Sequence, residues 1–286
     1  MNLTQLRISR RTIALAAALL CTVSLAIGAH AALSVRALDA AKAVATEQGN
    51  EGSTSRLALL IGNGHYPDAA APLSQPINDA RALTGALRRN GFDVDVIEDA
   101  TREDMARAVE RLKGRIKRDS VVMLFFGGYG VQSGRESYMI PVDATIWKEA
   151  DVRRDGVSIE SVLDIMKEKG ARAKLAVIDA SRRNPYERRF RTFSHGLAPI
   201  TAPNNALILS SATPGKVAED SKGDDSVLVA ELLQHLETHS VAGAEAVFNK
   251  TRVAISRASD GEQVPSVSSS LLEDVRFGAA AGPAGS

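Results

Sequence analysis

The chain has 286 residues, of which 44% are hydrophobic, 24% charged and 4% aromatic, a composition that excludes a disordered or collagen-like protein. Its 35 basic and 34 acidic residues give a formal charge of +1. Three arginines lie in the first 31 residues, and the remaining 32 basic and 34 acidic residues carry a charge of −2, which argues against general nucleic-acid binding. The single cysteine, Cys21, excludes an intrachain disulfide.

The first 31 residues have the pattern of a bacterial export signal. Three arginines precede an uncharged apolar run over 12–27, and small residues around Ala29 and Ala31 suit a signal peptidase. The pair Arg10-Arg11 is also typical of a twin-arginine signal. We predict a secretory signal peptide over 1–31, removed together with Cys21, and a periplasmic or secreted protein. The alternative is an uncleaved inner-membrane anchor, with the rest of the chain outside the cytoplasm.

Residues 32–55 have a linker composition, and the small residues near the C-terminus predict a disordered tail over 274–286. Between them, apolar runs alternate with segments of helical period. In chain order we predict a strand at 57–61, a helix at 77–89, a strand at 92–97, a helix at 102–117, a strand at 121–126, a helix at 159–169, strands at 174–179 and 206–210, and helices at 225–237 and 244–257. This alternation predicts an α/β fold with a mostly parallel sheet and helices on both faces.

Two of the predicted strands end in residues that could carry chemistry, at the edge of the sheet where ligands usually bind. The strand at 121–126 is followed by Gly127-Gly128-Tyr129-Gly130, and the strand at 174–179 by Ala180-Ser181-Arg182. Glycines let backbone N–H groups approach a bound carbonyl, and period-two alternation puts Asp179 and Ser181 on one side of their strand. A serine beside an aspartate suits a hydrolase, although turns of this kind also occur as plain structure.

Several segments in one order resemble the caspase-like peptidases of clan CD, family C14, and specifically the bacterial metacaspase-type or orthocaspase group. The matching segments are Leu59-Leu60-Ile61-Gly62-Asn63, Asn78-Asp79-Ala80, residues 125–132, residues 138–144, Asp179-Ala180-Ser181-Arg182 with Asn184-Pro185, residues 212–220 and residues 261–265. The resemblance covers residues 56–273 and implies a single caspase-like domain with the three-layer αβα caspase–haemoglobinase fold.

The chain departs from this family at both catalytic positions. Tyr129 stands where the family has its histidine and Ser181 where it has its cysteine, and the spacing of about 50 residues typical of caspases is kept. A serine hydroxyl needs a base to take its proton, and a phenol with an ordinary pKa of about 10 is a proton donor at neutral pH. We therefore predict that the chain lacks cysteine peptidase activity.

The resemblance also implies a binding site for basic side chains. Asp79 and Asp179 occupy positions that line the pocket for an Arg or Lys side chain, and the backbone N–H groups of Gly130 and Ser181 would face the carbonyl oxygen. The alternative is structural, with Asp79 tethering its helix and Asp179 satisfying amides at the strand end. The predicted partner is a peptide or protein with Arg or Lys, such as an active caspase-like relative. We predict neither a metal nor a cofactor.

Three functional hypotheses follow from these observations. The preferred one is an exported, catalytically inactive caspase-like protein that binds or regulates. The second is a Ser181-dependent hydrolase that cleaves after Arg or Lys with another histidine, such as His65 or His195, as base. The third is a structural or assembly module. The five arginines within 182–191 could dock an anionic partner, but we interpret them as a solvated loop.

Overall fold

The computed structural model describes residues 55–70, 72–180, 183, 185–186, 196–218, 223–238 and 242–278. These residues belong to one compact unit, Ser55–Ser286. The predicted signal peptide over 1–31, nearly all of the predicted linker and the last eight residues lie outside the described residues. Within the described part of the chain, no helix has both the length and the hydropathy that a bilayer crossing requires.

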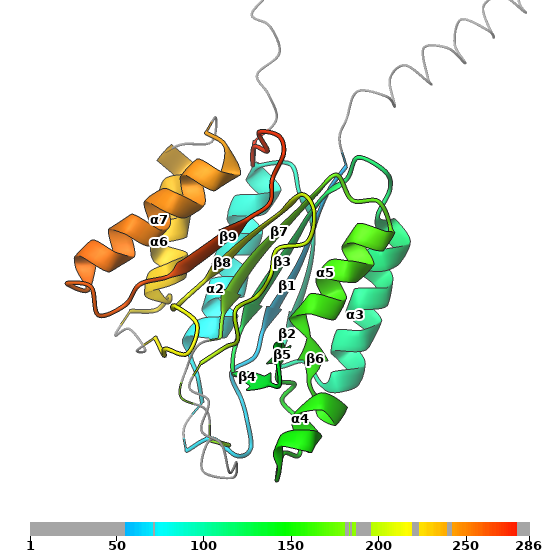
Figure 1. Ribbon diagram of the computed structural model, residues 1–286, viewed down its shortest axis with the longest axis vertical. Helices are drawn as coiled ribbons and strands as arrows, with labels where there is room; N and C mark the ends of the chain where they lie inside the picture. The colour runs from blue at the N-terminus through cyan, green and yellow to red at the C-terminus, as the bar shows by residue number, and fades with distance from the viewer. Residues whose placement is uncertain are drawn as a thin grey trace, which may run out of the picture. The chain divides into compact units, whose positions relative to one another are not determined.

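A six-stranded sheet forms the centre of this unit (Figure 1). Its strands, in spatial order, are β2 (Asp93–Glu98), β1 (Arg56–Gly62), β3 (Val121–Gly127), β7 (Ala173–Asp179), β8 (Ala206–Ser210) and β9 (Ser266–Ser269). The first five strands are parallel, and β9 pairs with β8 in the antiparallel sense at the edge. The predicted mostly parallel sheet is confirmed, with β9 as an edge strand that was not predicted.

Helices cover both faces of the sheet, as predicted. Figure 1 shows α2 (Gln75–Arg89), α6 (Val227–Thr238) and α7 (Ala244–Ala258) on one side and α3 (Arg102–Arg115) and α5 (Ile159–Glu168) on the other. Alternate residues of β3 separate the two cores, because Met123 and Phe125 pack in one hydrophobic cluster and Leu124 and Phe126 in the other. Burial on both faces explains why these strands read as continuous apolar runs.

The sequence at the start of α3 fixes where that helix begins. The hydroxyl of Thr101 accepts the N–H of Asp104 at 3.2 Å, and the Asp104 carboxylate accepts the N–H of Thr101 at 3.1 Å. This reciprocal capping box satisfies two backbone donors that the first turn leaves without partners. The helix therefore starts directly after β2 and its short turn, which brings its apolar face onto the sheet.

A smaller antiparallel sheet follows β3 and was not predicted. It contains β4 (Gly130–Ser133), β5 (Glu136–Met139) and β6 (Val157–Ser158), and the short helix α4 (Glu149–Asp155) lies between β5 and β6. Strands of two to four residues are too short for a periodic pattern to distinguish them from loops. They matter because β4 starts one residue after Tyr129 and holds the chain close to the edge of the main sheet.

The packed chain continues beyond the predicted boundary at residue 273. Val275 and Phe277 are buried in the core, and the Arg56 guanidinium donates to the carbonyl oxygens of Arg276, Phe277 and Gly278. Residues 274–278 therefore belong to the folded unit rather than to the disordered tail that we expected.

Candidate functional site

The two predicted dyad positions follow neighbouring parallel strands. Gly127, at the end of β3, lies opposite Asp179, at the end of β7. Two hydrogen bonds continue this pairing past the strands, because the N–H of Gly128 donates to the Asp179 carbonyl at 3.3 Å and that of Gly130 to the Ala180 carbonyl at 3.0 Å. The loop with Tyr129 is thus held against Ala180, the residue before Ser181. Ser181 lies outside the described residues.

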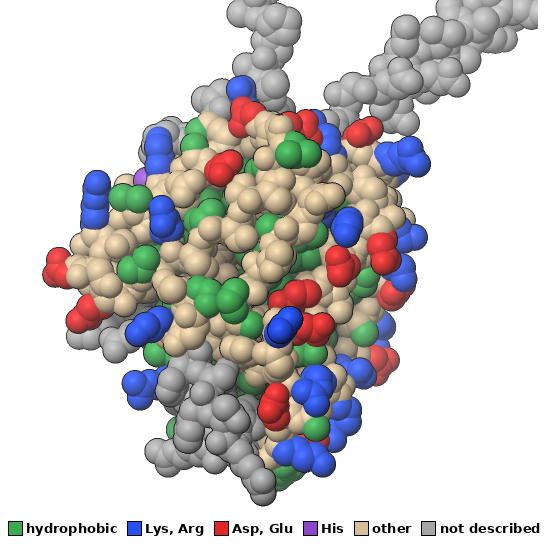
Figure 2. All heavy atoms as spheres, in the orientation of Figure 1, with side chains coloured by type: hydrophobic (Ala, Val, Ile, Leu, Met, Phe, Trp, Pro, Cys, Tyr) green, Lys and Arg blue, Asp and Glu red, His purple; other side chains and the backbone are tan. Residues whose placement is uncertain are grey.

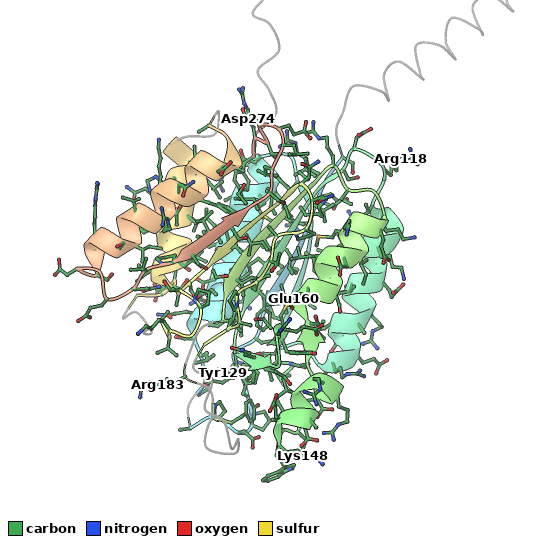
Figure 3. All side chains as sticks on the ribbon, in the orientation of Figure 1. Arg118, Tyr129, Lys148, Glu160, Arg183 and Asp274 are labelled. Carbon is green, nitrogen blue, oxygen red and sulfur yellow. The ribbon has the colours of Figure 1, made fainter. Side chains whose placement is uncertain are left out.

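Tyr129 is a buried side chain at the lower end of the sheet in Figure 3, with 6% of its surface exposed. Its ring packs against Tyr66, with centroids 4.6 Å apart and planes tilted by 53°. The Tyr66 hydroxyl accepts the Tyr129 N–H at 3.1 Å and donates to the Ile140 carbonyl at 2.9 Å, and the Ile140 N–H returns to the Tyr129 carbonyl at 3.0 Å. Backbone and ring are therefore both fixed by packing and hydrogen bonds.

All four tyrosines of the chain lie in one cluster around this position, a gathering that sequence reasoning missed. Tyr66 follows β1, Tyr129 follows β3, Tyr138 lies in β5, and Tyr186 comes from the segment after Ser181. Aliphatic side chains such as Ile140 complete the cluster, which is separate from the two cores of the sheet. The described members of this cluster therefore form an aromatic core that contains no imidazole.

Two glycines allow the close approach of this loop. Gly128 has a φ of +153°, and a Cβ there would lie 2.5 Å from the Tyr66 hydroxyl. A Cβ on Gly130 would lie 2.6 Å from Leu197 and 2.8 Å from Ala180. Gly130 was also expected to offer its N–H to a substrate carbonyl, but in this structure that N–H is bonded to the Ala180 carbonyl. An oxyanion could use it only after that bond opens.

Asp79 lies in α2 and is fully buried. One of its carboxylate oxygens accepts the backbone N–H of Ser226 at 2.8 Å, directly before α6. The Ser226 hydroxyl in turn caps that helix by accepting the N–H of Val229 at 3.2 Å. This contact matches the structural alternative for Asp79, because it ties α2 to the start of α6.

Asp179 is buried at the end of β7, next to a second polar residue from the neighbouring strand. Ser211 follows β8 and donates its N–H to the Ile178 carbonyl at 3.0 Å. The Ser211 hydroxyl is shielded from solvent and makes no hydrogen bond within the described part of the chain. A carboxylate accepts hydrogen bonds and a hydroxyl can both donate and accept them, so two buried polar groups follow neighbouring strands at this end of the sheet.

His65 is paired with a carboxylate at the same edge of the sheet. Its Nδ1 lies 2.6 Å from Asp99 Oδ2, and the N–H groups of Gly64 and His65 both donate to Asp99 Oδ1 at 2.9 Å. Partial burial acts to raise the pKa of Asp99, but these hydrogen bonds outweigh it and hold that pKa below its usual value. A carboxylate that orients an imidazole is an arrangement suited to a general base. Asp99 had not been singled out from the sequence.

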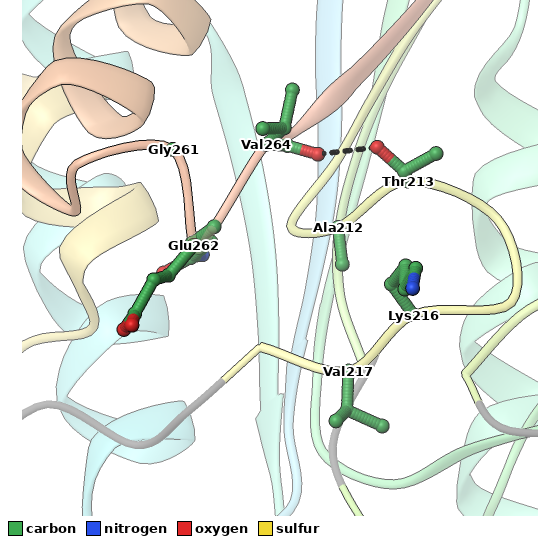
Figure 4. A pocket seen from close by; sticks show the side chains of 8 residues that line it. Ala212, Thr213, Lys216, Val217, Gly261, Glu262 and Val264 are labelled. Atoms are coloured by element: carbon green, nitrogen blue, oxygen red, sulfur yellow. Dashed lines mark hydrogen bonds between the residues drawn. The ribbon is translucent and has the colours of Figure 1, made fainter.

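A cavity of about 260 Å³ opens beside β8 at this edge (Figure 4). Its walls come from two segments: Ala212, Thr213, Lys216 and Val217 follow β8, and residues 261–264 precede β9. Two hydrogen bonds join the walls: the Thr213 hydroxyl donates to the Val264 carbonyl at 2.8 Å, and the Gln263 side chain donates to the Ser211 carbonyl at 2.9 Å. These bonds connect the two segments beside the cavity, and both polar and apolar side chains line it.

Comparison with known proteins agrees with this fold. Residues 55–276 match the family model Peptidase_C14, Caspase domain. A stretch of 133 residues is 29% identical to the human protein named mucosa-associated lymphoid tissue lymphoma translocation protein 1, and equally to its mouse homolog. That stretch is 46% of this chain but only 16% of either relative. Because the family model spans most of the chain, including both sheets and every described helix, the chain belongs to the caspase domain family, peptidase C14.

Proposed function

We propose that this chain is an exported caspase-domain protein that does not cleave peptides by cysteine peptidase chemistry and instead binds a protein or peptide partner. The observation that carries the proposal is Tyr129, a buried phenol at the position that the family resemblance assigns to the catalytic histidine. The sequence places Ser181 where that resemblance expects cysteine. The chain thus offers neither a thiolate nor an imidazole at these two positions.

The chemistry of this pair argues against an acyl-enzyme. A serine nucleophile must lose its proton during attack, and the group that receives it has to be an acceptor at the working pH. A tyrosine phenol, with an ordinary pKa of about 10, is a donor at neutral pH. The ring of Tyr129 is packed against Tyr66, and its backbone is held by hydrogen bonds on both sides. Movement of this residue towards a substrate would break the tyrosine cluster.

The partner that we propose carries an exposed Arg or Lys, as in an extended segment of an active caspase-like relative. Support comes from the buried polar groups at the strand ends, the Asp179 carboxylate and the Ser211 hydroxyl. These groups are shielded from solvent in this structure, so a basic side chain reaches them by displacing residues that now cover them. The cavity beside β8 would receive neighbouring side chains of the same segment.

Loss of activity is tested with fluorogenic peptides that end in Arg or Lys. We expect no turnover by the wild-type chain above that of the Ser181→Ala variant, which removes the hydroxyl and little else. Turnover that depends on Ser181 would refute the proposal. The test is independent of partner identity because it reads the bond cleavage itself.

Retention of the binding pocket is tested by restoring the family residues. The double variant Tyr129→His with Ser181→Cys should cleave after Arg or Lys and not after norleucine, which has no charge. Asp179→Asn in that background should reduce cleavage by about tenfold or more, since it removes a charge-assisted hydrogen bond. If the double variant folds but neither cleaves nor binds an Arg peptide, the pocket for basic side chains is refuted. The third hypothesis, a structural or assembly module, would then remain.

A second candidate, the Ser181-dependent hydrolase, rests on the pairing of His65 with Asp99. His65 is well exposed, and the carboxylate fixes its orientation, so it could act as a base towards the 181 loop. Turnover that disappears in both Ser181→Ala and His65→Gln would establish this reaction. Turnover that survives His65→Gln would exclude His65 as its base.

Export is proposed from the sequence of residues 1–31 alone. Cell fractionation of the tagged full chain should place it outside the cytoplasm, and replacing Arg10 and Arg11 by lysine should retain it inside if the twin-arginine route is used. N-terminal sequencing of the exported protein then distinguishes a cleaved signal from an anchor.

A further inference from the structure

A second hollow lies along α7, beside the segment that precedes β9. It has a volume of about 240 Å³ and is lined by Arg252, Val253, Ser256, Arg257 and Val264. Arg252 and Ser256 lie one helical turn apart, as do Val253 and Arg257, so four of these residues form two adjacent rows on α7. Val264 closes the hollow from the segment before β9. We call this surface the α7 groove.

The two arginines of the α7 groove lack charge partners. Neither Arg252 nor Arg257 pairs with a carboxylate in the described part of the chain, and the Nε of Arg252 is shielded from solvent without a hydrogen bond. Most other described arginines behave differently. Those paired with Asp or Glu are Arg81, Arg89, Arg107, Arg111, Arg115, Arg153, Arg154, Arg172 and Arg276. The groove thus concentrates guanidinium groups whose hydrogen-bonding capacity is unused.

Apolar surface separates these charges. Val253 is 38% exposed and Val264 is 36% exposed, and both belong to the few large hydrophobic side chains that the described residues leave at the surface. Figure 2 shows Lys and Arg side chains with hydrophobic ones between them over the part of the face where Figure 1 draws α7. No acidic side chain lines the groove. Its chemistry is therefore an apolar floor with two cationic hydrogen-bond donors.

We propose that the α7 groove binds an acidic peptide segment of a partner protein, in which carboxylate side chains flank a branched apolar side chain. The carboxylates would accept bidentate hydrogen bonds from Arg252 and Arg257, and the apolar side chain would cover Val253 and Val264. The valines favour a peptide over inorganic phosphate, which has no apolar part. Val264 also lines the cavity beside β8, so the two hollows adjoin. The α7 groove uses neither the dyad positions nor Asp79 and Asp179, and it takes the opposite charge.

The experiment measures fluorescence anisotropy of a fluorescein-labelled heptapeptide that alternates glutamate and valine, titrated with the full chain at low salt. The control probe carries glutamine in place of glutamate. Arg252→Gln and Arg257→Gln test the two donors, Val253→Ser tests the floor, and Lys250→Gln is the matched control because Lys250 lies on the same helix outside the groove. Thermal unfolding of each variant verifies that it folds.

We expect saturable binding of the acidic peptide, weakened about tenfold by each arginine substitution, as for loss of one charge-assisted hydrogen bond, and unchanged by Lys250→Gln. Val253→Ser should weaken it several-fold. The proposal is overturned by absence of binding, by equal binding of the glutamine peptide, or by insensitivity to the arginine substitutions in folded variants. Full displacement by millimolar inorganic phosphate would also overturn it, because the groove would then be a general anion site.

Discussion

Tyr66→Phe is the substitution that most directly tests how the tyrosine cluster holds the site. It removes one hydroxyl that makes two buried hydrogen bonds, one from the Tyr129 N–H and one to the Ile140 carbonyl. The ring and its contact with Tyr129 are retained, so hydrophobic burial hardly changes. Loss of two buried bonds, each with a net value of about 1 kcal/mol and with both backbone partners left unsatisfied, predicts a destabilisation of about 2–3 kcal/mol.

Tyr138→Phe is the matched control in the same cluster. The Tyr138 hydroxyl donates to the Glu136 carboxylate at 2.7 Å, and burial, together with that carboxylate, raises the pKa of Tyr138 to about 12. Glu136 is exposed, so water replaces the lost donor when the hydroxyl is removed. We therefore expect Tyr138→Phe to destabilise the protein by less than about 1 kcal/mol, although the chemical change is identical.

Both variants are compared by urea unfolding followed by circular dichroism, with the dependence on urea concentration expected to be equal among the three proteins. The reasoning is refuted if Tyr66→Phe lowers the free energy of unfolding no more than Tyr138→Phe does. It is also refuted if Tyr66→Phe changes the urea dependence rather than the midpoint, because the effect would then lie in the denatured state.

Further predictions concern packing and charge. Gly130→Ala forces a Cβ against Ala180 and Leu197 and should destabilise the protein by about 1–3 kcal/mol. Gly114→Ala lies in α3, where a Cβ meets nothing within 4 Å, and should stabilise the protein by about 0.5–1 kcal/mol. Thermal unfolding of both variants measures these changes. Burial, and secondly the charge of Lys167, lower the pKa of Lys174 from its ordinary value of 10.5. The charged ammonium therefore costs the folded state stability at lower pH. The free energy of unfolding of the wild-type protein should rise as the pH passes from the lowered pKa towards 10.5. Lys174→Met should remove that part of the pH dependence, while it also removes the hydrogen bond that the Lys174 ammonium donates to the Ala171 carbonyl at 3.1 Å. Equal pH profiles for the two proteins would contradict the assignment.

The main sheet and its helices could be predicted because each strand and helix carries its own periodic signal. Residues 121–126 are apolar throughout since both faces of β3 are covered, and the Thr101–Asp104 capping box marks the start of α3. The small sheet β4-β5-β6 and the edge strand β9 could not be predicted in this way. They consist of short segments in which Ser is frequent, and contacts with other strands, rather than local sequence, hold them in place.

The position of Tyr129 could also be predicted, since parallel strands end at a common edge, but its surroundings could not. Tyr66, Tyr138 and Tyr186 are far apart along the chain, and no spacing rule brings them together. The same limit applies to Asp79, whose contact with the Ser226 N–H spans 147 residues. Sequence reasoning left its binding and tethering roles equally open, and the observed hydrogen bond matches the second.

The tyrosine cluster has a consequence for any attempt to restore catalysis. The Tyr129 ring packs against Tyr66 within the tyrosine cluster. An imidazole in its place is smaller, more polar and in need of a hydrogen-bond partner. Tyr129→His should therefore lower the free energy of unfolding by about 2–4 kcal/mol, in the range of large-to-small changes in a core. Urea unfolding of the single variant measures this loss, and a value below 1 kcal/mol would mean that the ring contributes little to the packing. If the loss is large, this end of the fold is stabilised by the same residue that removes the base, and the double variant Tyr129→His with Ser181→Cys should recover the dyad at the expense of stability.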